Sequence, residues 1–498
     1  MLKNVSHYVG KQDASEILFD TSFGYTFEFL CTCQDHLLAP GHKTIASLQK
    51  LGEIMADLGS TTDPQTDQDS TIPSIYTYLG QFIDHDITAR TDRDSEFSNI
   101  SDPNSITPKS PAEVVANLRN GRRPQLDLDS VFGEGPSFTK YYKAEADHLY
   151  NNVSLNLYIE DSPAGYLDLR RENKKAEIAD ERNDENLMVS QLHACFIKMY
   201  NKINTAIEPG LTNQEAYSRA RQLTRWAYQY VVVNDYLHQV CDASIMNDIQ
   251  LNGPFYYSSN IPYMPLEFSV AAFRFGHAMI RPFYNINDTQ TKNIMELLGP
   301  SMSNLMDNGT GKLKSENVIK WSHYASFNGS TPTNMARKIS PFIAKGLFDL
   351  SPVGATPPPS VLASLSQRNL LRGYLLSIPA GQSIAEAMRI SPLTHQQLVE
   401  GLNDEQKCAL YDSGFTARTP LWYYVLQEAK VQQDGNKLGY VGSKLVGETL
   451  VGLVKGDFNS YMNNMTDPAV TPDGILLPGS TTPIKTIADI LTYTEVHI

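Results

Sequence analysis

Cysteines are few in this chain, and their positions form no recognisable framework. Only five occur among 498 residues. Their odd number and wide spacing exclude a disulfide scaffold, and the two that lie close together lack a second pair that could complete a zinc site. We therefore expect free thiols, most of them small core residues, and a reducing compartment. The five are Cys31, Cys33, Cys195, Cys241 and Cys408.

A surplus of basic residues and a long apolar run are also missing. The chain has 41 Lys and Arg against 55 Asp and Glu, a formal net charge of −14. This balance excludes nucleic acid and a polybasic membrane anchor as partners. No apolar run reaches the roughly 18 residues that a membrane span needs. The N-terminus lacks a charged stretch followed by an apolar one, so we expect a cytoplasmic protein or export by a non-classical route.

What the sequence does contain is helical periodicity. Apolar residues recur at three- and four-residue steps over 185–207, which predicts an amphipathic helix. Thr212 and Glu215 have the spacing of a capping box, which predicts a second long helix to about Leu237. Strand-like alternation is rare and short. We predict a mainly α fold, with one large helical domain over 71–498 and an N-terminal segment, 1–70, that packs on or wraps the core.

A first polar group lies in the segment YTYLGQFIDHDIT. On a helix, Gln81, Asp84 and His85 stand at positions i, i+3 and i+4 and share one face. Asp86 points about 100° further round. One short helix could thus supply a polar triad to one site and a carboxylate to another. The alternative is a solvated helix end, which the flanking apolar residues argue against.

A second group, Arg182 and Glu185, precedes the amphipathic helix. An arginine is permanently charged and offers a fork of donors, which suits it to stabilising negative charge that develops on oxygen. The alternative is a surface ion pair of little energetic value.

A third candidate, His277, lies within the apolar segment FSVAAFRFGHAMIRPF. We predict a helix here, with Pro282 near its end. Gly276 carries no side chain, so a flat cofactor could approach the histidine closely. The alternative is a core histidine whose ring nitrogens are satisfied internally.

In this order, GQFIDHD (80–86), DERNDEN (180–186) and AFRFGH (272–277) resemble the motifs of the animal haem peroxidase (peroxidase–cyclooxygenase) superfamily, its bacterial branch in particular. LDLDSVFG (126–133) resembles that family's calcium loop, and RNLLRG (368–373) resembles the segment behind its proximal ligand. TPLWYYVLQEA (419–429) is similar to a later helix. The resemblance spans about 74–461.

The resemblance implies a haem b cofactor with His277 as the axial iron ligand. The other ring nitrogen of His277 would donate a hydrogen bond to Asn369, and Arg372 would bind a haem propionate. On the opposite side His85 would be the general base, Arg182 would stabilise charge during O–O cleavage, and Gln81 would hydrogen-bond water or a small substrate.

The implied activity is reduction of hydrogen peroxide through an oxoferryl intermediate, with oxidation of iodide, bromide, thiocyanate or phenols. Asp84 and Glu185 occupy positions that carry ester links to haem in this family. The chloride-oxidising member has a methionine after that glutamate. Asn186 stands there in this chain, so we do not expect ready chloride oxidation.

The resemblance also implies a calcium site. Asp86, Asp127 and Asp129 match carboxylate ligand positions, and hard oxygen ligands suit Ca²⁺. Arg123 replaces a threonine, so only its backbone carbonyl could serve, as could that of Gln125. Sodium, an empty site and a plain acidic turn are the alternatives.

Two rival functions share the same motifs. Fatty-acid dioxygenases of the superfamily place a radical-forming tyrosine three residues before the proximal histidine. Arg274 stands there in this chain, and Tyr284 lies on the wrong side of the ligand. A non-enzymatic adhesion or structural module should have lost His85, Arg182 or His277, and all three are present.

Overall fold

The computed structural model describes residues 3–4, 21–56, 68–92, 100, 102–138, 143–161, 166–172, 174–207, 210–257, 261–348, 350 and 363–498. Within them the fold is mainly α-helical, as predicted. The α-helices are α1 (Glu28–Cys31), α2 (His42–Ile54), α3 (Ile75–Ile87), α4 (Pro111–Asn117), α5 (Asp129–Phe132), α6 (Leu187–Ala206), α7 (Asn213–Val231), α8 (Leu237–Val240), α9 (Ala243–Asn252), α10 (Leu266–Ser269), α11 (Ile294–Leu297), α12 (Leu365–Leu375), α13 (Gly381–Ala387), α14 (His395–Leu398), α15 (Asp404–Ser413), α16 (Leu421–Gln433), α17 (Tyr440–Gly456) and α18 (Ile487–Tyr493).

The strands are short and bind distant segments together. The largest sheet has the order β1 (Lys3–Asn4), β4 (Arg90–Asp92), β5 (Leu118–Asn120), β2 (Thr21–Gly24) and β10 (Met264–Pro265). Within it only β2 and β10 pair in parallel. The antiparallel pairs elsewhere are β3 (Asp69–Pro73) with β13 (Met335–Arg337), β6 (Ile159–Asp161) with β7 (Leu167–Leu169), β8 (Arg171–Glu172) with β9 (Lys175–Ala176), β11 (Phe283–Asn285) with β12 (Thr291–Asn293), and β14 (Val470–Thr471) with β15 (Gly474–Ile475).

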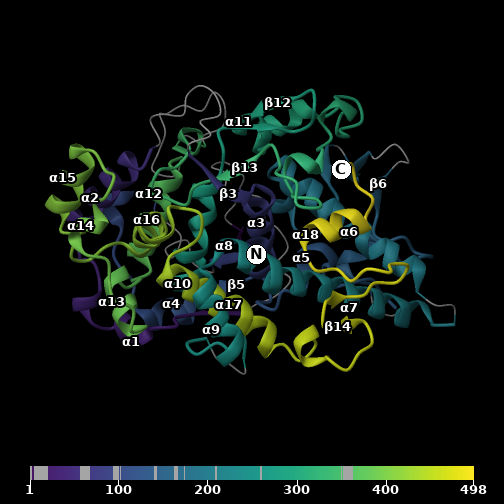
Figure 1. The fold of residues 1–498 in the computed structure, drawn as a ribbon, viewed down its shortest axis with the longest axis horizontal. Helices are drawn as coiled ribbons and strands as arrows, with labels where there is room; N and C mark the ends of the chain where they lie inside the picture. Colours follow the sequence, from purple (N-terminus) through teal and green to yellow (C-terminus); the bar gives the residue numbers. More distant parts are fainter. Residues whose placement is uncertain are drawn as a thin grey trace.

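Helix α3 lies at the centre of the molecule. Figure 1 shows it between α12 and α16 on one side and α5, α6 and α18 on the other. Eleven of its thirteen residues are buried, which explains why its sequence is apolar nearly all round. It packs against α6 and against the 3₁₀ helix that carries His277. The helix expected around Gln81 is thus confirmed, and it lies in the core and not at a solvated helix end.

The two long helices predicted after residue 185 are also confirmed. The side chain of Asn186 accepts from the backbone N–H of Val189 and so begins α6. Thr212 and Glu215 form the expected capping box at α7. The chain then makes a π-helical turn over Val232–Tyr236 before α8. A Cβ on Gly80 would lie 2.6 Å from the hydroxyl of Tyr236, so this turn needs glycine on α3.

The segment around His277 departs from the expected form. It is a 3₁₀ helix, Ala272–Met279, that stops before Pro282. The indole N–H of Trp422 on α16 donates to the backbone carbonyl of Arg274 at 3.2 Å. Helix α16 thus holds the backbone of this segment by a tertiary contact.

The described part of the N-terminal segment joins the core. Strand β2 enters the main sheet, and α2 packs against α12 and α15. Leu48 and Leu51 are buried in the same apolar cluster as Leu79 of α3. The boundary at residue 70 stays a prediction, because 57–67 lie outside the described residues. No described helix combines the length and apolar character that crossing a bilayer requires.

Candidate active site

A mainly apolar cavity lies between α3 and the 3₁₀ helix of His277. Its volume is about 100 Å³. Its polar walls come from elements far apart in the sequence. These residues are Gln81 and Asp84 of α3, Glu185 and Asn186 before α6, and Arg274 and His277.

Gln81, one of the predicted distal residues, is held by Asn186 at the start of α6. The Asn186 amide donates to Oε1 of Gln81 at 2.8 Å, while its own oxygen caps α6. The Gln81 amide nitrogen is therefore directed away from Asn186. Asp84 and Glu185, the two carboxylates predicted to carry ester links, both line the cavity.

His85 is buried next to this wall and is not among the lining residues. Its Nδ1 faces Oδ1 of Asn183 at 2.8 Å. The Asn183 amide nitrogen faces Nδ1 of His193 at 2.9 Å. Burial lowers the pKa of His193 to about 3, so that ring is neutral. Nδ1 of His85 is thus engaged by Asn183.

Arg182 is held behind the same wall by four hydrogen bonds. Its Nε and Nη2 donate to the carboxylate of Asp180 at 3.0 and 2.7 Å. Nη2 also donates to the carbonyl of His85 at 2.8 Å, and Nη1 to that of Thr88 at 2.7 Å. Because a guanidinium has five N–H groups, one on Nη1 remains for a ligand. The structure thus places Arg182 beside His85, but not as a side chain projecting into the cavity.

Asp180 binds a second arginine as well. Nε and Nη2 of the buried Arg122 donate to its Oδ2 at 3.1 and 2.5 Å. Burial alone would raise the pKa of Asp180, yet Arg122 and Arg182 hold it well below its usual range. One negative charge is therefore shared by two positive ones.

On the opposite wall, His277 and Asn369 are in contact, as predicted. The amide nitrogen of Asn369 lies 3.0 Å from Nδ1 of His277. The amide oxygen is turned toward Nη1 of Arg274 at a long 3.5 Å. A half-turn of the amide would give the predicted bond and leave the lone pair of His277 on Nε2.

The predicted propionate partner, Arg372, does not line the cavity, whereas Arg274 does. In the sequence, Arg274 had no assigned role beyond excluding a tyrosine at that position. Its place three residues before His277, on the same short helix, is the signal that could have assigned it to the site. An arginine suits a carboxylate because the contact can be bidentate.

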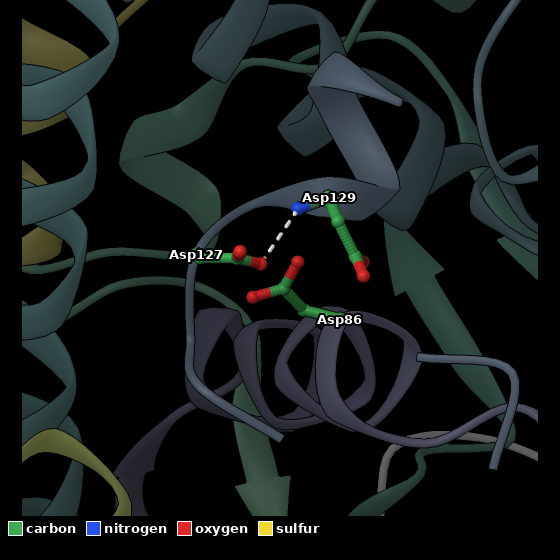
Figure 2. Close-up of side chains that lie close together, drawn as sticks. All are labelled: Asp86, Asp127 and Asp129. Atoms are coloured by element: carbon green, nitrogen blue, oxygen red, sulfur yellow. Dashed lines mark hydrogen bonds between the residues drawn. The ribbon is translucent and has the colours of Figure 1, made fainter. Parts of the chain in front are cut away.

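The predicted calcium ligands Asp86, Asp127 and Asp129 come together on the far side of α3. One carboxylate oxygen from each lies within 4.8 Å of the others, and all three residues are buried. Figure 2 shows Asp86 reaching from α3 toward the loop that carries the other two. Burial and the neighbouring Asp127 raise the pKa of Asp86 to about 7. Burial also raises the pKa of Asp129.

Arginines surround this acid cluster. Nη2 of Arg123 lies 2.9 Å from Oδ2 of Asp127, and Nε of Arg122 lies 3.7 Å from Oδ1 of Asp129. The carbonyl of Arg123 accepts from the N–H of Gln125. That of Gln125 accepts from the side chain of Gln229 at 3.3 Å. The chain thus supplies much of the charge compensation that a cation would bring.

Comparison with known proteins agrees with this geometry. The family model for animal haem peroxidase matches residues 125–373, half of the chain. The chain belongs to the animal haem peroxidase family. Thyroid peroxidase of Homo sapiens is 24% identical over 204 residues, which are 36% of this chain and 21% of that protein. Peroxidase mlt-7 of Caenorhabditis elegans is 32% identical over 111 residues, 21% of this chain and 15% of that protein. The matches thus span about a fifth or less of these relatives.

Solved structures share the fold over nearly the whole chain. Peroxidase A from Dictyostelium discoideum aligns with a TM-score of 0.64 at 14% identity, covering 98% of this chain and 95% of that one. The fatty acid alpha-dioxygenase of Oryza sativa aligns with a TM-score of 0.61 at 13% identity, covering 91% and 79%. At such identities these likenesses show the peroxidase–dioxygenase fold alone.

Haem, which the animal haem peroxidase family implies, suits the residues of the cavity. A Cβ added to Gly276 would meet no atom within 4 Å, so there is open space directly beside His277. The walls around it are largely apolar, with Ile280, Leu298 and Leu347 among them. Arg274 offers a cation for a carboxylate, and Asp84 and Glu185 face the same space. The donor set therefore fits a flat apolar group with acidic edges.

Proposed function

We propose that the protein is a haem-dependent peroxidase that reduces hydrogen peroxide and oxidises iodide, bromide, thiocyanate or phenols. The observation that carries this proposal is the pairing of His277 on one wall of the cavity with Gln81, Asp84 and Glu185 on the other. His85 and Arg182 stand directly behind the second wall. The donor class rests on the family resemblance.

His277 would hold the iron, Arg274 a propionate, and Asp84 and Glu185 would form ester links at the edge of the ring. When bound, haem supplies the iron at which peroxide is reduced. His85 would take the peroxide proton at Nε2 and return it to the departing oxygen. Arg182, beside His85, would favour charge separation across the O–O bond.

The acid cluster supports a second element of the proposal, a bound Ca²⁺ held by Asp86, Asp127 and Asp129. Asp86 belongs to the same helix as Gln81 and Asp84, so a cation there would fix the distal wall. The ion pair of Arg123 with Asp127 competes for one of these carboxylates.

Steady-state turnover of the haem-loaded protein tests the main proposal. Peroxide consumption would be followed with iodide, bromide, thiocyanate or a phenol as donor, and with chloride for comparison. We expect turnover with the first four and little with chloride, because Asn186 stands where the chloride-oxidising member has methionine. Oxygen uptake with a long-chain fatty acid, without peroxide-dependent turnover, would instead establish a dioxygenase.

The ester links have a separate test. After peroxide treatment, haem should remain attached to the protein under denaturing conditions, as seen by mass spectrometry. Asp84→Asn and Glu185→Gln should each remove one attachment. Haem that is released completely from the wild type would refute the links without touching the peroxidase proposal.

A further inference from the structure

Three buried side chains form a continuous chain of hydrogen bonds behind the distal wall. Nδ1 of His85 on α3 meets Oδ1 of Asn183 at 2.8 Å. Nδ2 of Asn183 meets Nδ1 of His193 on α6 at 2.9 Å. All three residues are fully buried, so water does not replace these partners.

The chemistry of an amide assigns the protons in this chain. The amide oxygen can only accept, so Nδ1 of His85 carries the hydrogen. The amide nitrogen can only donate, so Nδ1 of His193 carries a lone pair. In a neutral ring the second nitrogen has the complementary role. Nε2 of His85 is therefore the lone-pair nitrogen.

Several contacts hold the three side chains in place. Burial lowers the pKa of His193 to about 3, so its ring stays neutral and keeps an acceptor. The ring packs edge-on against Phe82, with centroids 6.1 Å apart. The backbone N–H of Asn183 donates to the carbonyl of Asp180 at 3.0 Å. Asp180 is in turn fixed by Arg122 and Arg182, so the backbone that carries the amide is anchored on both sides.

We propose that Asn183, oriented by His193, is a positioning residue that sets the tautomer of His85 so that Nε2 presents a lone pair. The inference rests on the proposed peroxidase function. In that function the proton of peroxide moves to Nε2 of His85. The resulting imidazolium keeps its Nδ1–H hydrogen-bonded to Oδ1 of Asn183. The same proton then leaves for the departing oxygen, and no electron passes through the three side chains. A His85 with hydrogen on Nε2 could not accept this proton.

The test uses the haem-loaded protein with carbon monoxide bound to the reduced iron. The C–O stretching band in the infrared reports whether the distal histidine donates a hydrogen bond to the ligand. At neutral to alkaline pH the wild type should show a high-frequency band, because Nε2 has no hydrogen to donate. Asn183→Leu should add a low-frequency band from the other tautomer. It should also slow the reaction with peroxide by roughly 10²–10⁴-fold, the range for loss of a correctly oriented base.

Conservative variants separate positioning from simple packing. Asn183→Asp keeps an acceptor for Nδ1 of His85 and should keep the high-frequency band. His193→Gln keeps an acceptor for the Asn183 amide, whereas His193→Leu does not. The glutamine variant should resemble the wild type and the leucine variant should show both bands. Asn317→Leu is the matched control, since Asn317 is also a buried amide, bonded to the carbonyl of Leu305, and its loss should leave the band unchanged.

Two results would overturn the inference. One is a low-frequency band that is present in the wild type and persists in Arg182→Ala, which would mean that Nε2 carries the hydrogen. The other is an unchanged band and peroxide rate in both Asn183→Leu and His193→Leu. A wild type with the expected band but no peroxide turnover would instead refute the proposed function alone.

Discussion

Two faces of helix α3 serve two sites of opposite character. One face presents Gln81 and Asp84 to an open, mainly apolar cavity. The other presents Asp86 to a closed cluster in which arginines lie against the carboxylates. The cavity has space for a ligand, with carboxylate and arginine side chains along its walls. In the cluster, Arg122 and Arg123 compensate part of the carboxylate charge. We therefore expect the cluster to stabilise the fold around the cavity.

The two sites are joined by one line of charges. Arg122 lies between Asp129 of the cluster and Asp180, and Asp180 holds Arg182 beside His85. Substitutions of cavity residues should weaken ligand binding and leave the fold intact. Substitutions in the cluster should mainly lower the free energy of unfolding. They should affect the reaction with peroxide only by displacing Arg182.

The largest effect is expected at the cavity wall opposite α3. His277→Ala removes the only nitrogen ligand proposed for the iron, so haem retention should be abolished in protein without covalent links. The measurement is the Soret absorbance per protein after gel filtration. His323→Ala is the control, because that ring bonds to Asp288 at the surface. Normal haem content in His277→Ala would remove the proximal assignment.

In the cluster, Arg122→Met should produce the largest loss of stability. It leaves Asp129 and Asp180 buried without their shared partner, and breaking a buried pair costs about 3–5 kcal/mol. Thermal unfolding should show a clearly lower Tm. Lys50→Met, which breaks an exposed pair with Glu405, should change stability by at most about 1 kcal/mol. Equal effects of the two variants would contradict the structural role of the cluster.

Some of this arrangement was predictable because it depends on local geometry. The helical spacing of Gln81, Asp84 and His85 puts them on one side of α3, and Asp86 follows on another. The capping residues of α6 and α7 likewise lie within a few positions of the start of each helix. The union of Asp86 with Asp127 and Asp129 followed only from the family resemblance, and the structure confirms it.

What escaped prediction depends on tertiary contacts. Asn183 stands in the quoted arginine motif, but nothing local shows that its amide meets His85 and His193. The hydrogen bonds that Arg182 makes to the carbonyls of His85 and Thr88 are equally non-local. His277 and Asn369 meet as expected, and the direction of their hydrogen bond stays a prediction, since the amide oxygen is turned toward Arg274 at 3.5 Å. The contact of Trp422 with the Arg274 carbonyl is likewise made between segments far apart in the sequence.

Arg182→Ala should slow the reaction with peroxide while haem stays bound. Deleting one charge-stabilising donor costs roughly 10²–10³-fold in comparable sites. Stopped-flow mixing with peroxide gives the rate, and the Soret absorbance gives the haem content. Arg219→Ala is the control, since Arg219 pairs with Asp467 away from the cavity. An unchanged rate would exclude Arg182 from the mechanism.

The smallest effect concerns the cation. Arg123→Thr removes the ion pair with Asp127 and adds a hydroxyl oxygen, so Ca²⁺ should bind more tightly than in the wild type. Calorimetry gives the affinity directly. In thermal unfolding, Ca²⁺ at about 100 times its Kd should add roughly 2.7 kcal/mol. If Ca²⁺ shifts neither protein's Tm, the cluster is a charge-compensated structural core and not a calcium site.

The most direct test of the central claim is stopped-flow absorbance of the haem-loaded protein mixed with hydrogen peroxide. The account predicts a Soret band that loses intensity rapidly and recovers when iodide or a phenol is added. A protein with no Soret band, or with a band that does not respond to peroxide, would have the fold of the animal haem peroxidases without their chemistry.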